Sequence, residues 1–88
     1  MNEVPEIQTL IAITTHADIL AGWRKLAATA DLEAARKLFS VINAAILDAE
    51  IDRQPRCRVA DRQAWRRCLE ALKSRYGRVV IRLPARSS

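Results

Sequence analysis

Apolar residues recur three and four positions apart along most of this chain, which is the spacing of an α-helix that buries one face. The first stripe follows Pro5, a residue favoured at the start of a helix because its missing N–H group is not needed there. Its members are Ile7, Leu10, Ile11 and Thr14. The two threonines at 14–15 then interrupt the spacing, so the sequence allows either a separate second helix or a single bent one.

A second stripe predicts a helix over about residues 16–28, with Thr15 as its N-cap. This stripe consists of Ile19, Leu20, Trp23, Leu26 and Ala27. Gly22 lies within the predicted helix, where a glycine costs about 1 kcal/mol relative to alanine. The position is therefore a candidate for a close approach between two helices.

The longest stripe predicts a third helix, from an N-cap at Asp31 to about Ile51. Its seam consists of Leu32, Ala35, Phe39, Ile42, Ile46 and Ala49, and it is widened by Leu38, Val41 and Ala45. Ala44 and Leu47 extend the apolar surface towards the polar face. A helix that is apolar over so much of its circumference is either central in the core or covered by a second copy or another protein.

The next part of the chain combines helix and strand signals. Residues 52–58 are predicted to form a connector, and 56–59, which overlaps its end, has the pattern of a short strand. Asp61 is the expected N-cap of a fourth helix over about residues 62–76, and Gly77 is expected to end that helix in a left-handed conformation. The apolar stripe of this helix consists of Trp65, Cys68, Leu69, Leu72 and Tyr76.

Alternating side chains at 78–83 predict a final strand, which Pro84 ends. A lone strand leaves half of its backbone groups unpaired, so this one must pair with 56–59 or with the same strand of a second copy. The sequence therefore predicts a mainly α fold: a small helical domain of three to four helices with one or two short C-terminal β-strands. We expect a single domain over residues 1–84 and a frayed tail at 85–88.

Composition narrows the class of protein. The chain has 88 residues, of which half are apolar and 28% are charged, and this balance is typical of one globular domain. No apolar run approaches the ~18 residues that a membrane-spanning helix needs. The chain begins without a recognisable secretion signal, so we expect a cytoplasmic protein that does not bind membranes.

Residues for catalysis or metal binding are sparse. Cys57 and Cys68 are separated by ten residues, and His16 is the only histidine, which is too few ligands at the wrong spacing for a zinc site. The chain has two glycines, too few for a glycine-rich phosphate loop. We therefore expect no metal, no cofactor, no small-molecule substrate and no enzymatic activity.

Charge is distributed unevenly along the chain. Residues 1–51 contain four basic and seven acidic side chains, whereas residues 52–88 contain eleven basic and three acidic ones. Twelve of the fifteen basic residues are arginine, whose planar fork of donors suits phosphates and carboxylates. A basic surface of this kind attracts a polyanion from a distance.

We expect basic side chains of the C-terminal half to share one surface. Its predicted members are Arg56, Arg58, Arg62, Arg66, Lys73, Arg78 and Arg82. The first functional hypothesis is therefore a small non-enzymatic binding module whose basic C-terminal half contacts nucleic acid or a nucleic-acid-binding partner protein, in the second case through an acidic surface of that partner.

The alternative hypothesis is a protein–protein inhibitor or assembly factor that acts by occluding a partner surface. Ala44, Leu47 and Ile51, on the flank of the third helix, would form its interface with another protein or with a second copy in a homodimer. Small size and abundant arginine and alanine fit an accessory protein of prokaryotic or phage origin.

Overall fold

The part of the chain that this computed structural model describes, residues 4–77, is mostly helical. Its elements are α1 (Pro5–Ile13), α2 (Ala17–Ala27), α3 (Leu32–Ile51), the 3-10 turn η1 (Val59–Asp61), α4 (Arg62–Leu72) and the π-helical turn η2 (Lys73–Gly77). The mainly α prediction is confirmed. The strand predicted at 56–59 is absent from the described residues, while the strand at 78–83 and the tail at 85–88 lie outside them.

The segment 56–59 makes a single β-bridge in place of a ladder. Cys57 pairs in antiparallel fashion with Thr14, and the Thr15 N–H donates a hydrogen bond to the Arg56 carbonyl oxygen at 2.8 Å. Pairing stops there because only three residues separate α1 from α2 and because η1 begins directly after the bridge. The same three-residue break shows that α1 and α2 are separate helices, so the single bent helix is excluded.

The helix starts confirm one predicted cap and correct another. Asp31 Oδ2 accepts a hydrogen bond from the Ala34 N–H at 2.9 Å, which satisfies one of the free donors at the start of α3. The N-cap of α2 is His16 and not Thr15, because α2 begins at Ala17, one residue later than predicted, and the Thr15 N–H bonds to the connector. Asp61 does hold the N-cap position of α4, but its side chain makes no capping hydrogen bond.

The left-handed residue that ends a helix is not the glycine that the sequence predicted. After α3, the Gln54 N–H bonds to the Ala49 carbonyl at 2.8 Å and the Arg53 N–H to the Glu50 carbonyl at 3.1 Å, the pattern of a Schellman motif. Arg53 holds the left-handed position with a φ of 59°, which costs a non-glycine residue roughly 1–2 kcal/mol. Gly77 has no positive φ, because the chain continues from α4 into η2.

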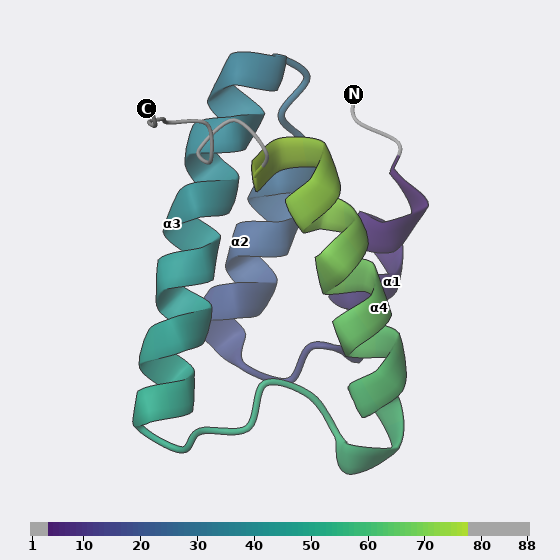
Figure 1. Ribbon diagram of the computed structural model, residues 1–88, viewed down its shortest axis with the longest axis vertical. Coiled ribbons are helices and arrows are strands. Elements are labelled where there is room, and N and C mark those ends of the chain that lie inside the picture. The colour runs from purple at the N-terminus through teal and green to yellow at the C-terminus, as the bar shows by residue number, and fades with distance from the viewer. Residues whose placement is uncertain (1–3, 78–88) are drawn as a thin grey trace, which may run out of the picture.

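The four helices form an open ring. α1 packs against α2 and α4, α2 packs against α3, and η2 closes one end of the ring against α3. Figure 1 shows α2 behind the space between α3 and α4. Apart from Val4, the buried apolar residues belong to the predicted stripes: Val4, Ile7, Leu10, Ile19, Trp23, Leu26, Ala35, Phe39, Ile42, Ile46, Ala49, Trp65, Leu72 and Tyr76. Leu32 and Val41 are exceptions, since both are exposed although the pattern placed them with the core.

Four aromatic side chains connect the helices through the middle of the core. The Trp23 ring lies 6.2 Å from Trp65 in an edge-to-face arrangement and 6.3 Å from Phe39, and Phe39 lies 5.7 Å from Tyr76. Such pairs add about 0.5–1.5 kcal/mol each beyond their buried area. These aromatic contacts join α2 to α3 and α4, and α3 to η2. The aromatic side chains therefore hold all four of these elements together through the core.

Gly22 occupies a close approach between α2 and α3, as its position in the predicted helix suggested. A Cβ atom at this position would lie 2.8 Å from Ile42 Cγ1, closer than real carbon contacts allow. The glycine therefore lets the α2 backbone rest directly on a core side chain of α3. On this side of α3, the contact with α2 leaves no room for a larger residue at position 22 unless Ile42 moves.

Candidate functional site

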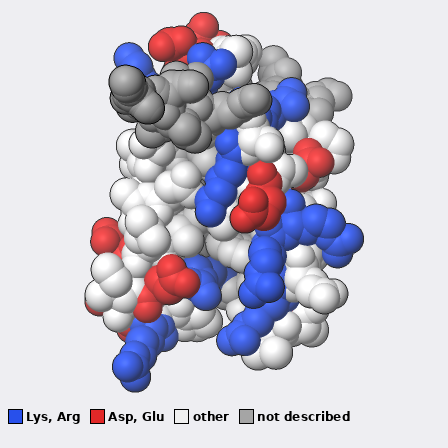
Figure 2. Space-filling view, in the orientation of Figure 1, with Lys and Arg blue, Asp and Glu red and all other residues white. Residues whose placement is uncertain are grey.

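A groove separates the second half of α3 from α4 and the start of η2 on the face shown in Figure 2. Its volume is about 490 Å³. We call it the α3–α4 groove, and its lining residues are Asn43, Ile46, Leu47, Glu50, Arg56, Trp65, Arg66, Leu69, Glu70 and Lys73. It exists because α4 packs on α1 and α3 packs on α2, so these two helices are joined mainly through η2.

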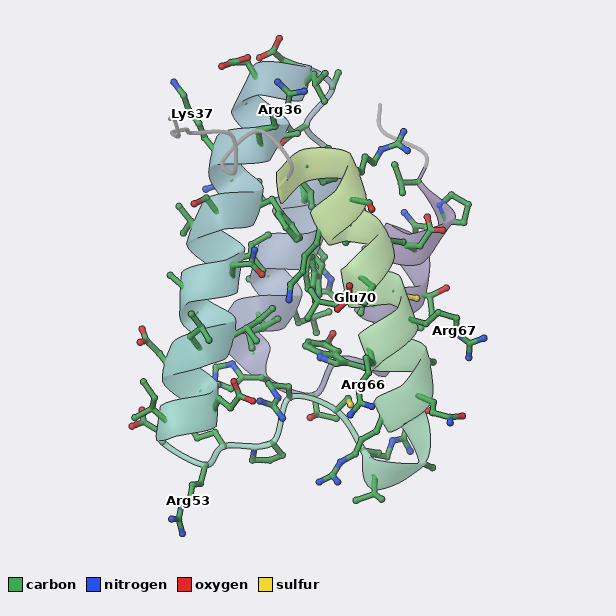
Figure 3. The ribbon with its side chains drawn as sticks, in the orientation of Figure 1. Arg36, Lys37, Arg53, Arg66, Arg67 and Glu70 are labelled. Atoms are coloured by element: carbon green, nitrogen blue, oxygen red, sulfur yellow. The ribbon has the colours of Figure 1, made fainter. Side chains whose placement is uncertain are left out.

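The α4 side of the groove is basic. Arg66 and Lys73 are both exposed, and neither takes part in an ion pair within residues 4–77. They lie seven residues apart on α4 and η2, two helical turns, which places them on one face. In Figure 2 the blue side chains run down the α4 side, and Figure 3 shows Arg66 on the groove side of α4 while Arg67 points away.

The α3 side of the groove has an apolar centre at Leu47, which lies between the polar residues Asn43 and Glu50. Leu47 is 58% exposed on its rim, while Ile46 is buried beneath it. Trp65, only 7% exposed, and the half-buried Leu69 complete an apolar floor from α4. Figure 2 shows the middle of α3 as mostly uncharged surface beside the blue α4 side. The apolar wall that Leu47 and Ile46 form on α3 thus faces the basic wall of Arg66 and Lys73 across the groove.

One ion pair closes the lower end of the groove. Arg56 Nη1 lies 3.4 Å from Glu50 Oε2, with the arginine side chain 28% exposed. The arginine is held there because its carbonyl accepts the Thr15 N–H in the β-bridge region. Arg56 is therefore partly neutralised, and the free positive charge of the groove comes from α4 and η2. Glu70, on the basic wall, offsets part of that charge without an ion pair in the described range.

The remaining predicted basic residues do not line the groove within the range that the structure describes. Arg58 lies 3.8 Å from Asp61 Oδ2 in an exposed pair outside the groove, and Arg62 is exposed near the start of α4 without lining the groove. Arg78 and Arg82 lie outside the described residues. The basic surface predicted from charge alone is therefore centred on Arg66 and Lys73 within the range that the structure describes.

The two predicted surfaces meet on the groove. Leu47, assigned from sequence to a protein interface, lines the same groove as Arg66 and Lys73, assigned to a basic patch. Ala44 and Ile51, the other predicted interface residues, are exposed on α3 but outside the groove. Sequence reasoning missed Asn43 and Glu50 as groove residues. Their spacing around Leu47 places all three on one helical face, which is the signal that identifies them.

A second, shallower hollow of about 320 Å³ lies between α1 and α4. It is lined by Pro5, Glu6, Thr9, Ala64, Arg67, Cys68 and Ala71. Burial raises the pKa of the Cys68 thiol, and nearby Glu6 adds to the rise; burial likewise raises the pKa of Cys57, with a contribution from Asp61. Both thiols are thus held in their protonated, less nucleophilic form.

His16 does not belong to a cluster of chemical groups. Its Nε2 lies 2.7 Å from Gln54 Oε1, which ties the start of α2 to the connector after α3. Its Nδ1 is buried and has no hydrogen-bond partner among the described residues. Within residues 4–77, no three His, Cys, Asp or Glu side chains are grouped as metal ligands would be.

Comparison of the chain with protein-family models, curated proteins and solved structures finds no match in any of the three. No helix among residues 4–77 is both long enough and apolar enough to cross a membrane. The α3–α4 groove, with its two walls and its charges, is therefore the basis for assigning a function.

Proposed function

We propose that this protein is a non-enzymatic binding module that holds an acidic, amphipathic segment of a partner protein in the α3–α4 groove. The observation that carries the proposal is the apolar wall at Leu47 facing the basic wall at Arg66 and Lys73. A helix or extended segment with apolar residues on one side and carboxylates on the other matches both walls at once.

Each groove residue has a role in this proposal. Leu47 and Leu69, above the buried Trp65, give the apolar contact, which supplies most of the affinity. Arg66 offers a planar pair of donors to a carboxylate, and Lys73 adds a point charge two turns further along. The Arg56–Glu50 pair sets the lower boundary of the groove.

The groove is better suited to an acidic protein segment than to nucleic acid. The chain's four aromatic side chains are at most 7% exposed, so none offers the flat surface on which unpaired bases stack. Glu50 and Glu70 lie among the cations and would repel phosphates. The apolar wall also has no counterpart on a phosphate backbone. Nucleic-acid binding by the basic half stays a prediction, and the test below includes it.

The experiment is a fluorescence-anisotropy titration with labelled probes of defined chemistry. One probe is a synthetic helix-forming peptide with Leu on one face and Glu on the other, and a second carries Lys in place of Glu. A labelled DNA oligonucleotide of comparable negative charge is the third. We expect binding of the acidic peptide that weakens with added salt, and no binding of the basic one.

Two double variants distinguish the groove from general attraction. Arg66→Glu with Lys73→Glu reverses two charges inside the groove and should weaken acidic-peptide binding about tenfold or more. Arg62→Glu with Arg67→Glu makes the same change in net charge on α4 outside the groove and should weaken it by less than about threefold. Equal loss in both variants contradicts the proposal, as does tight DNA binding without peptide binding.

A further inference from the structure

The outward face of α3 carries large apolar side chains that nothing in residues 4–77 covers. Four of the five large hydrophobic residues exposed in this range lie on α3, at 51–77% exposure: Leu32, Val41, Leu47 and Ile51. Four outward residues with spacings of four, three and four form one seam of the kind that packs helix on helix. We call them the α3 stripe, and its members are Ser40, Ala44, Leu47 and Ile51.

The charged side chains beside the stripe lie at the ends of α3 that the helix dipole disfavours. Arg36 and Lys37 lie in the first half of α3, whereas Asp48 and Glu50 lie in its last turn, which has no basic residue. The C-terminal end of a helix carries partial negative charge and disfavours acidic side chains there. Only Glu33, in the first turn, follows the favourable order.

Several of these charged groups lack partners within the described chain. Lys37 and Asp48 are exposed and form no ion pair within residues 4–77. Arg36 Nε is buried without a hydrogen-bond partner in the same range. Glu50 pairs with Arg56, but its side chain is 60% exposed and has room for a second donor. These groups flank the α3 stripe on both of its sides.

We propose that the outward face of α3, which carries the α3 stripe, packs against the outward face of α3 of a second copy in an antiparallel, two-fold symmetric dimer. The charges select the direction, because antiparallel packing places the basic first half of one α3 beside the acidic last turn of the other. Parallel packing would place like charges together. A two-fold axis also makes each contact occur twice, so one complementary pair becomes two.

A specific register satisfies both flanks. With the two-fold axis beside position 42, Ser40 lies opposite Ala44 of the second copy, and these small residues let the two backbones approach closely. In this register Leu47 lies opposite Lys37 of the second copy and Ile51 lies opposite Glu33, so the two apolar side chains pack on the aliphatic stems of these charged residues. On one flank Lys37 lies beside Asp48 of the second copy. On the other flank Arg36 lies beside Glu50 of the second copy. At 20 residues, α3 is about 30 Å long, which is enough for all of these contacts.

This inference is independent of the proposed function, although the two surfaces share an edge. Leu47 and Glu50 line the α3–α4 groove and also take part in the dimer contact, Leu47 as a member of the α3 stripe. Lys37 and Asp48 do not line the groove. Variants at these two positions therefore test the dimer without changing the groove.

The experiment is a charge exchange read by sedimentation equilibrium over a wide range of protein concentration. The wild-type protein is expected to show a concentration-dependent monomer–dimer equilibrium. Lys37→Glu or Asp48→Lys alone converts two attractive pairs into two repulsive ones and should weaken the dimer about tenfold. The variant with both changes restores two opposite-charge pairs and should recover an affinity within about threefold of wild type.

The outcomes separate the dimer from the groove proposal. Both substitutions are on exposed side chains, so thermal unfolding curves of the diluted variants should match wild type, and acidic-peptide binding should be retained. A wild-type chain that stays monomeric at every concentration overturns the dimer. So does a double variant that remains as weak as the single ones, because the two positions then do not face each other.

Discussion

The two sides of α3 differ in how closely they are packed. Towards α2, the helices approach so closely that Gly22 has no room for a Cβ atom beside Ile42. Towards α4, the same helix faces a groove of about 490 Å³ lined with charged and apolar side chains. The difference lies in the residues opposite α3: α2 presents glycine and a buried tryptophan, whereas α4 and η2 present Arg66 and Lys73, whose hydrated charges resist burial.

This contrast assigns stability to one side of the molecule and binding to the other. The closed side contains fully buried side chains such as Trp23, Phe39 and Leu26. The open side contains exposed groups whose removal leaves the core intact. Substitutions on the closed side should therefore lower the free energy of unfolding. Substitutions on the open side should change ligand binding while the free energy of unfolding stays nearly constant.

The largest expected effect is that of Phe39→Ala. This ring contacts both Trp23 and Tyr76 and is 1% exposed, so its loss opens a cavity where α2, α3 and η2 meet. We expect a loss of about 3–5 kcal/mol in the free energy of unfolding, measured by chemical denaturation. Leu47→Ala, on the open side, should cost less than about 1 kcal/mol. Similar losses for the two variants would remove the distinction between the sides.

A smaller effect is expected from Gly22→Leu. Helix propensity alone favours leucine over glycine by about 0.8 kcal/mol, but the new side chain must displace Ile42. We expect a net loss of about 1–3 kcal/mol from overpacking. Ala21→Leu, on the exposed face of the same helix, is the matched control and should change stability by less than about 0.5 kcal/mol. A stabilised Gly22→Leu variant would show that the closed side has spare room.

The helices and most of the core could be predicted from the sequence because each buried face repeats at helical spacing. The pattern failed where tertiary context decides. Nothing local shows that Arg53 takes the left-handed turn after α3, or that Gly77 does not take one. The pattern also placed Val41 with the core, although only the position of α2 determines which part of the broad apolar surface of α3 is covered.

The site was predictable in its parts but not in its assembly. Charge counting identified Arg66 and Lys73, and the apolar flank of α3 identified Leu47, but as members of two separate surfaces. Their meeting depends on α4 packing against α1 and leaving α3 unpaired at its lower end, which is a property of the helix arrangement. The pairing of Arg56 with Glu50 likewise depends on the bridge between the connector and the α1–α2 linker.

The most direct test of the groove as a docking site is to map the acidic peptide onto the protein by NMR. The peptide is titrated into isotope-labelled protein while the backbone amide signals are followed. We predict shifts concentrated in residues 43–50 of α3 and 65–73 of α4 and η2, which line the groove. Shifts concentrated at Glu6, Thr9 and Cys68, in the hollow between α1 and α4, or uniformly small shifts across the molecule, would contradict the account.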